Sequence, residues 1–155
     1  SFALLFEARL DGADATGANF EEARMARVQL INGTFDDANF TYVDMREGRL
    51  GGASFRNATL TGAWLHVSQL TRADLTGAIA IGTSFYNANM VKAIVLGADL
   101  TEADLRQTDL RETDFTNANL TNSYFKSALV LEAIFTGAIT QGTDFPAGFV
   151  PNLVE

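Results

Sequence analysis

The sequence contains no cysteine, one histidine and two prolines among its 155 residues. Without cysteine the chain has neither a disulfide framework nor a thiolate metal site. The single histidine, His66, falls short of the several ligands that a metal site normally gathers, so we expect a surface residue. Both prolines, Pro146 and Pro151, lie near the end, which indicates one regular structure followed by a distinct C-terminal tail. No apolar run approaches the length that spans a membrane, so we expect no membrane insertion.

Basic residues are also scarce. The chain has 11 lysines and arginines against 19 aspartates and glutamates, which gives a net charge of −8. A nucleic-acid-binding domain normally carries a basic patch or stripe, so this balance argues against direct nucleic-acid binding. It suits solubility or a basic partner. The length fits one domain, and the first residue, Ser1, is what removal of a leader or a tag would leave.

What the chain has in abundance is a five-residue repeat. Residues 98–120 read ADLTE, ADLRQ, TDLRE, TDFTN and ANL: a small residue, Asp or Asn, Leu or Phe, then two polar residues. Steps of five from Leu5 to Val150 meet an apolar residue at 29 of 30 positions, with Thr140 as the exception. The residue two places earlier is alanine in 19 of these 30 units. A period of five fits neither a helix nor a strand, and it indicates a solenoid whose backbone turns every five residues.

The pattern resembles the pentapeptide-repeat family, whose motif is A(D/N)LXX, over essentially residues 3 to 150. The resemblance implies an all-β fold, a right-handed quadrilateral β-helix with four units per coil and no inserted loops. Thirty units then make about 7.5 coils and, at roughly 4.8 Å between stacked strands, a rod about 36 Å long. We expect residues 1–145 to form this β-helix and residues 146–155 to form a capping tail, in which Phe149, Leu153 and Val154 cover the end.

The polar positions of the repeat have a structural explanation. Eight aspartates directly precede a core residue, and asparagine, serine and threonine occupy the same position elsewhere, which indicates side chains that hydrogen-bond to the turn. Glycines such as Gly12 and Gly62 follow the core residue by two places and indicate turns, while Ser68 falls at the small inward position. A filled axis offers no pocket for two differently tuned carboxylates, so we expect no catalytic residue, no cofactor and no metal.

Residues twenty apart stack on one side of such a rod, which gives four faces. The first face is centred on residues 5 to 145 in steps of twenty, the second on 10 to 150, the third on 15 to 135 and the fourth on 20 to 140. The third and fourth faces (the acidic faces) each carry a net charge of −4, whereas the first and second (the mixed faces) hold ten of the eleven basic residues and are near neutral. We predict that the acidic faces meet any basic partner. Their candidate contact residues are Glu21, Glu22, Asp36, Asp37, Asp74, Asp99, Glu102 and Asp114.

A second candidate surface is apolar. Just before the tail, apolar residues replace polar ones on every face, and together with the tail they predict self-association through the C-terminal end, as a homodimer. The residues of this surface are Tyr124, Leu129, Leu131, Ile134, Ile139, Phe149 and Leu153. Two alternatives remain: the tail folds back over these residues, or the first coil, with Phe2 and Phe6 outside the core column, is the adhesive end.

Two functions are open on the sequence alone. The first is a non-enzymatic protein-interaction or scaffold module with an unidentified protein partner. The second follows from the resemblance, because some family members are quinolone-resistance proteins that resemble a DNA rod and bind gyrase. About 36 Å of B-DNA carries roughly 21 negative charges, whereas the two acidic faces sum to −8, so we favour the interaction module. The resemblance also points to bacteria, cyanobacteria in particular, and we favour the cytoplasm over the periplasm or a thylakoid lumen.

Overall fold

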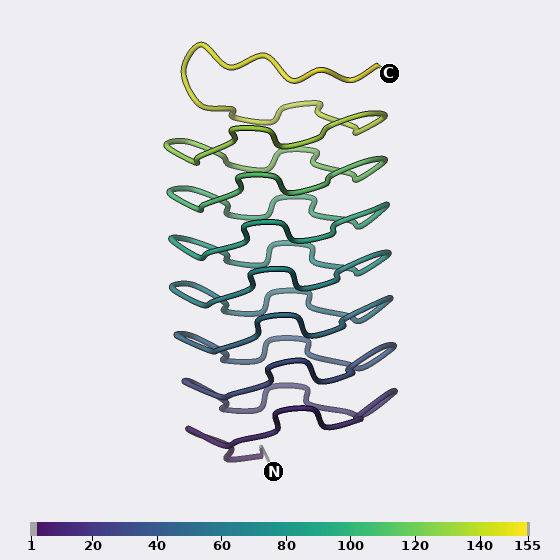
Figure 1. The fold of residues 1–155 in the computed structure, drawn as a ribbon, viewed down its shortest axis with the longest axis vertical. Helices are drawn as coiled ribbons and strands as arrows, with labels where there is room; N and C mark the ends of the chain where they lie inside the picture. Colours follow the sequence, from purple (N-terminus) through teal and green to yellow (C-terminus); the bar gives the residue numbers. More distant parts are fainter. Residues whose placement is uncertain (1–2, 155) are drawn as a thin grey trace.

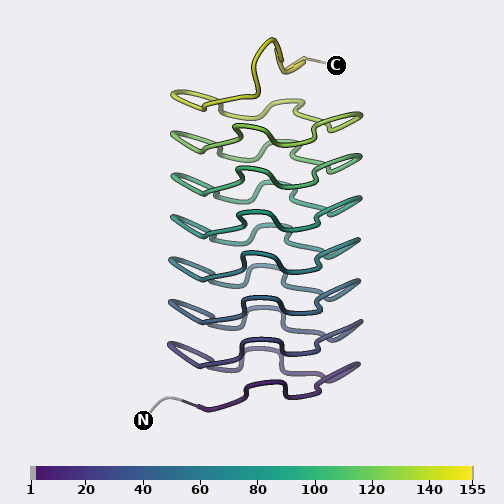
Figure 2. The same ribbon diagram turned by 90° about the vertical axis from the view of Figure 1, so that its left-hand side faces the viewer.

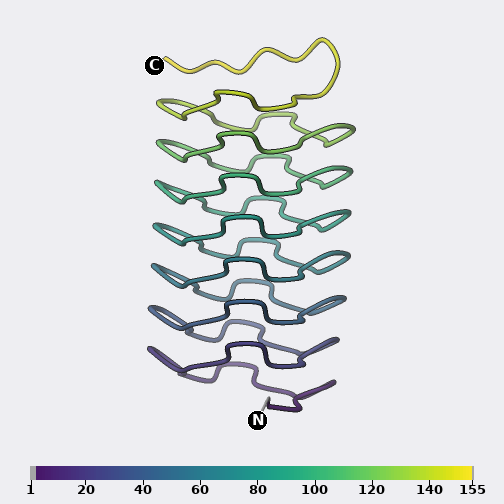
Figure 3. The ribbon, with the colours of Figure 1, turned by 180° about the vertical axis from the view of Figure 1, so that it is seen from behind.

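The computed structural model describes residues 3–154, which wind into a rod of stacked coils with the two ends of the chain at opposite ends of the rod (Figures 1 and 2). The coils keep one outline along the rod, also when it is seen from behind (Figure 3). Between residues 3 and 154 no helix and no extended strand forms, and each five-residue unit contributes one isolated bridge residue followed by a turn. Because the chain turns again so soon, each side of a coil has room for only one bridged pair.

Parallel bridges between residues twenty apart hold the coils in register. They occur at every fifth residue, without interruption, from Leu4↔Arg24 to Tyr124↔Asp144. Around each bridge, backbone N–H groups donate to the neighbouring coil, as Leu5 N does to the Arg24 carbonyl oxygen at 2.8 Å. Four five-residue units therefore complete one coil, as the resemblance to the pentapeptide-repeat family implies.

Each corner of a coil is a four-residue turn. The N–H of the small residue donates back to the carbonyl oxygen of the preceding core residue, for example from Ala8 to Leu5 at 3.0 Å. The second corner residue has a positive φ in 19 non-glycine residues and in glycines such as Gly62 (φ 63°). A positive φ at that position is the geometry of a type II turn, which glycine adopts without strain. The prediction that these glycines mark turns is confirmed.

The large residues of the repeat fill the axis of the rod. Phe115, which is fully buried, stacks on Phe135 with ring centroids 5.2 Å apart. Small residues occupy the second inward position, and every buried side-chain nitrogen or oxygen of the described residues has a hydrogen-bond partner. Ser68 is one of the small inward residues: it is fully buried, and its hydroxyl donates to the Leu65 carbonyl oxygen. Its predicted packing role is confirmed.

The C-terminal end departs from the repeat after Asp144, the last bridged residue. The chain then crosses the end of the rod (Figure 1), in a turn in which Phe149 N donates to the Pro146 carbonyl oxygen at 3.0 Å. The Phe149 ring consequently packs 5.6 Å from the rings of both Phe135 and Phe145. Val150, which the five-residue spacing places in the core column, is 84% exposed instead. The spacing is wrong at this position because the turn brings Phe149 onto the core one residue early.

The two ends of the rod are covered to different extents. Near the C-terminus the Leu153 carbonyl oxygen accepts a hydrogen bond from Gly137 N at 2.9 Å, although the Leu153 side chain stays 37% exposed. Val154 is largely exposed, so of the three residues expected to cover this end only Phe149 packs its side chain against the core. At the N-terminal end the core residues of the first coil are only partly buried, and Phe6 is exposed beside the guanidinium of Arg27. Phe2 lies outside the described residues.

Candidate functional site

The described surface offers shallow, open depressions. Within residues 3–154, no three His, Cys, Asp or Glu side chains gather as a metal site requires, and no helix has the length and hydrophobicity to span a membrane. His66, which we expected at the surface, is half-buried and lines one of the depressions together with Phe6, Arg46 and Val67. Candidate functional residues are therefore to be found on the faces and corners of the rod.

The aspartates and asparagines that precede core residues stabilise the corners. The Asp114 carboxylate accepts hydrogen bonds from the Thr116 backbone N–H at 2.9 Å and from the Thr116 hydroxyl at 2.6 Å. The side-chain oxygen of Asn119 accepts the same two bonds from Thr121, at 3.1 and 2.6 Å. Because the amide and the carboxylate accept the same two hydrogen bonds, the prediction that this position hydrogen-bonds to the turn is confirmed.

Most charged residues of the mixed faces are paired with each other. Arg106 donates from Nε and Nη2 to the two oxygens of Asp104 at 2.8 and 2.7 Å, and Arg111 binds Asp109 in the same way. Burial raises the pKa of Asp104, but the hydrogen bonds from Arg106 outweigh this effect and leave that pKa below its usual value. Seven of the eight ion pairs among the described residues lie on these two faces.

The acidic faces contain the remaining ion pair, in which Arg56 Nε lies 2.7 Å from an Asp74 carboxylate oxygen. Burial raises the pKa of Asp74, and hydrogen bonds from Thr76 and Arg56 lower it by more. Asp36 is also engaged, because it accepts hydrogen bonds from the Ser54 hydroxyl and from the Arg56 N–H. One predicted contact residue, Asp74, is therefore neutralised within the protein.

The predicted acidic residues are spread along the rod. Asp74 and Asp114 belong to one ladder of bridges, with Ile94 between them. Glu22 and Glu102 are both exposed at the same corner, but eighty residues separate them, which is four coils or about 19 Å at roughly 4.8 Å per coil. The fold thus places the eight residues along two successive faces, as predicted, without gathering them into one compact patch.

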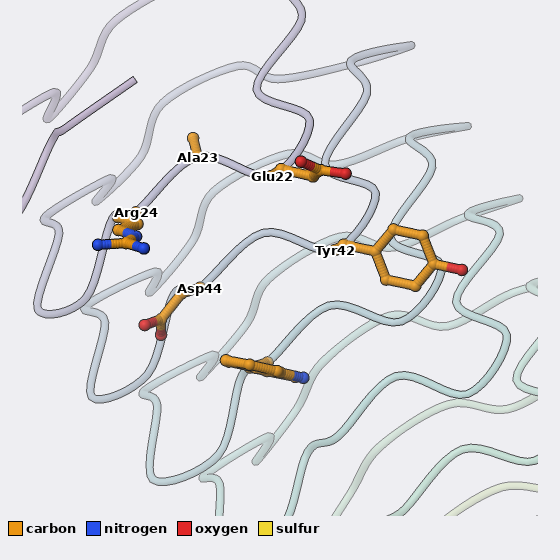
Figure 4. A pocket seen from close by; sticks show the side chains of 6 residues that line it. Glu22, Ala23, Arg24, Tyr42 and Asp44 are labelled. Carbon is orange, nitrogen blue, oxygen red and sulfur yellow. The ribbon is translucent and has the colours of Figure 1, made fainter. Parts of the chain in front are cut away.

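An aromatic depression lies at the edge of the fourth face. It has a volume of about 210 Å³ and is lined by Glu22, Ala23, Arg24, Tyr42, Asp44 and Trp64 (Figure 4). Tyr42 is 61% exposed and Trp64 is 52% exposed. The Tyr42 ring lies over Gly62, where a Cβ atom would come within 2.4 Å of it. The five-residue pattern does not single out Tyr42; the signal that could have found it is an aromatic residue twenty positions before a glycine.

The predicted self-association residues form a ring around the rod. Tyr124, Leu129, Ile134 and Ile139 occupy the bridge positions of four successive faces, and all four are exposed. Leu131, at the corner beside them, is 68% exposed. The other two predicted residues do not belong to this ring: Phe149 packs its ring on the end of the core, and Leu153 lies in the tail that crosses it.

Comparison with known proteins adds the family. The sequence pattern of the family described as pentapeptide repeats matches in eight copies, over residues 3–41, 34–66, 68–107 and 97–137. No curated protein sequence matches. The solved structure of HetL, a pentapeptide repeat protein involved in heterocyst differentiation regulation from the cyanobacterium Nostoc, is similar with a TM-score of 0.64. It is 22% identical over 92% of this chain and 91% of HetL.

A second similar structure is a trypsin-treated form of QnrB1, a plasmid-mediated fluoroquinolone resistance protein. Its TM-score is 0.57, at 22% identity over 92% of this chain and 72% of that one. At these identities the likeness concerns the fold alone, which is a right-handed quadrilateral β-helix. Since the repeats match most of the sequence and each bridge pairs residues twenty positions apart, the chain belongs to the pentapeptide repeat family.

Proposed function

We propose that the protein is a non-enzymatic interaction module that presents its acidic faces to a basic protein partner. The observation that carries the proposal is the unequal pairing of charge. The cations of the mixed faces are mostly held in ion pairs with neighbouring carboxylates, whereas Arg56 makes the single ion pair that the described residues form on the acidic faces. Carboxylates without a cationic neighbour attract and orient a basic surface.

The aromatic depression supports the same proposal. Glu22 stands at the corner of the fourth face, and the exposed rings of Tyr42 and Trp64 line the depression beside it. The Arg46 guanidinium already lies over the Trp64 ring, 5.5 Å from its centroid. The Tyr42 ring beside the Glu22 carboxylate is therefore the one that suits a lysine or arginine side chain of the partner, because the ring contacts its stem and cation while the carboxylate binds its charge. This corner is therefore the proposed anchor of the acidic faces.

The test compares two charge reversals that change the net charge by the same amount in opposite directions. Proteins captured by the wild type from the source cell are measured against Asp37→Lys with Glu102→Lys, and against Arg49→Glu with Arg111→Glu. We expect the first double variant to weaken binding of the partner at least about tenfold, and the second to retain it. Equal losses from both double variants, with unchanged melting temperatures, contradict the proposal.

The alternative is a gyrase-binding protein that mimics DNA. The rod shape and the fold shared with QnrB1 favour it, and the low charge density of the acidic faces opposes it. A supercoiling assay with added protein separates the two proposed functions. If the protein inhibits gyrase and the Asp37→Lys, Glu102→Lys variant does not, the partner of the acidic faces is gyrase.

We also propose that two copies associate through the C-terminal end. The exposed ring that includes Leu131, and the exposed Val150 of the tail, gather apolar side chains near one end, and a contiguous exposed apolar patch is typical of an interaction site. Sedimentation of the wild type, Leu131→Glu and Val150→Glu tests this proposal. A truncation of the tail is a poorer test, because it would also remove the cap that Phe149 forms. A monomer at tens of micromolar, or a dimer that neither substitution affects, refutes it.

A further inference from the structure

The corner that follows the second face contains the two consecutive glycines of the chain, Gly51 and Gly52. Both side chains that normally project from this corner are therefore missing, and the Asn32 side chain of the preceding coil lies over Gly52. The resulting notch has a volume of about 410 Å³ and is lined by Ile31, Asn32, Arg49, Gly51, Gly52, Gln69, Thr71 and Arg72. Its walls come from the coils before and after the glycines, so three successive coils form one depression.

The notch is positively charged. Arg49 and Arg72 both line it, no carboxylate does, and neither arginine is within 4.0 Å of an acidic group among residues 3–154. Most other arginines of the described chain are held by a carboxylate, as Arg106 is by Asp104. Two arginines that line a common depression without a counter-ion favour an anion there.

The backbone supplies further donors at the same place. At some corners the first corner N–H donates to a carboxylate or amide oxygen, for example from Val91 to Asn89 at 3.1 Å. At others it has no acceptor among residues 3–154, and Gly51 and Thr71, the first corner residues beside the two arginines, are of this second kind. Since they occupy adjacent coils, the two donors lie roughly 4.8 Å apart.

The preceding coil shows how this corner binds an oxyanion. The Asp11 carboxylate accepts a hydrogen bond from the Ile31 N–H at 3.0 Å and lies 3.6 Å from the Arg9 guanidinium. One carboxylate thus joins a corner N–H to an arginine. One and two coils further along, the N–H groups of Gly51 and Thr71 and the two arginines are present, but no carboxylate of the described residues reaches them.

We propose that the Gly51–Gly52 notch is a binding site for a phosphate group. A tetrahedral dianion has enough oxygens to accept from two guanidinium forks and two backbone N–H groups at once, whereas a carboxylate has two. The net charge of −8 repels a polyanion, so the ligand is one phosphate group, free or carried on a phosphorylated peptide. The site does not depend on the acidic faces or on the partner proposed for them.

The experiment is a ¹H–¹⁵N NMR titration of the whole chain with inorganic phosphate and, separately, with a short phosphoserine peptide and its unphosphorylated form. We expect saturable shifts of the Gly51 and Thr71 amide signals with both phosphorylated probes, and none with chloride at equal ionic strength. A tighter response to the peptide assigns the site to a phosphorylated chain, and an equal response assigns it to the free ion. Shifts that do not saturate, or that are spread over all faces, overturn the proposal.

Three variants separate a built site from general charge. Arg49→Gln with Arg72→Gln is expected to weaken binding by about tenfold or more. Gly51→Leu fills the notch and keeps both arginines; Gly51 has no positive φ, and its added Cβ would meet only the Thr71 carbonyl oxygen at 3.7 Å, so the fold is retained and binding is lost. Arg24→Gln with Lys126→Gln removes two cations that lie outside the notch and form no ion pair among residues 3–154, and is the control matched in charge. Equal weakening by this control, or unchanged binding in Gly51→Leu, refutes the site.

Discussion

Replacing Phe115 by alanine measures how much one ring of the buried phenylalanine stack contributes to the free energy of unfolding. The Phe115 side chain is fully buried, stacks on Phe135 at 5.2 Å with an interplanar angle of 12°, and meets Phe125 edge-on at 5.8 Å. Burying such a side chain contributes about 1.5–3 kcal/mol, and each of the two aromatic contacts adds about 0.5–1.5 kcal/mol. The sum agrees with the usual cost of about 3–5 kcal/mol for removing a buried phenylalanine.

Equilibrium urea unfolding of two comparison variants makes this prediction specific. Phe115→Leu keeps most of the volume, and leucine fills the same ladder at Leu75, so we expect a loss below about 1.5 kcal/mol. Asp114→Asn should cost less still, because the amide oxygen of Asn119 already makes the same two hydrogen bonds with its threonine that Asp114 makes. If Asp114→Asn destabilises the protein more than Phe115→Ala, the assignment of core and turn roles is wrong.

Two further predictions concern pH and the corners. The native pKa of Asp104 lies below its usual value, so the stability that this carboxylate contributes is present above the unfolded pKa of about 3.9 and is lost as the pH falls through the native pKa. In a series from pH 7 to pH 3, the melting temperature should therefore begin to fall below about pH 5. The fall should be less steep in Asp104→Asn. At the corners, Gly62→Ala should lower the free energy of unfolding more than Gly97→Ala, because both glycines have a positive φ but only the Cβ at Gly62 would collide with Tyr42. The left-handed strain alone costs about 1–2 kcal/mol in either variant. Equal losses in urea unfolding would show that the collision is relieved at no cost.

The sequence alone determined the repeat of the fold. Each five-residue unit specifies its own inward pair, its turn and its outward polar position, so the assignment of Ser68 to packing and of Gly62 to a turn needed no knowledge of distant residues. This works because each coil contacts mainly its neighbours and the stability is roughly a sum over similar units. The prediction failed at Val150, where the repeat had ended and no further unit fixed the register.

Tertiary structure alone decided which outward side chains meet. Arg56 binds Asp74, eighteen positions away, and the Tyr42 ring lies over Gly62; these contacts depend on side-chain conformations between stacked coils, which a one-dimensional pattern does not specify. The notch at Gly51 has the same origin. It depends on how three coils lie beside one another, because stacking brings together residues that are twenty positions apart in the chain.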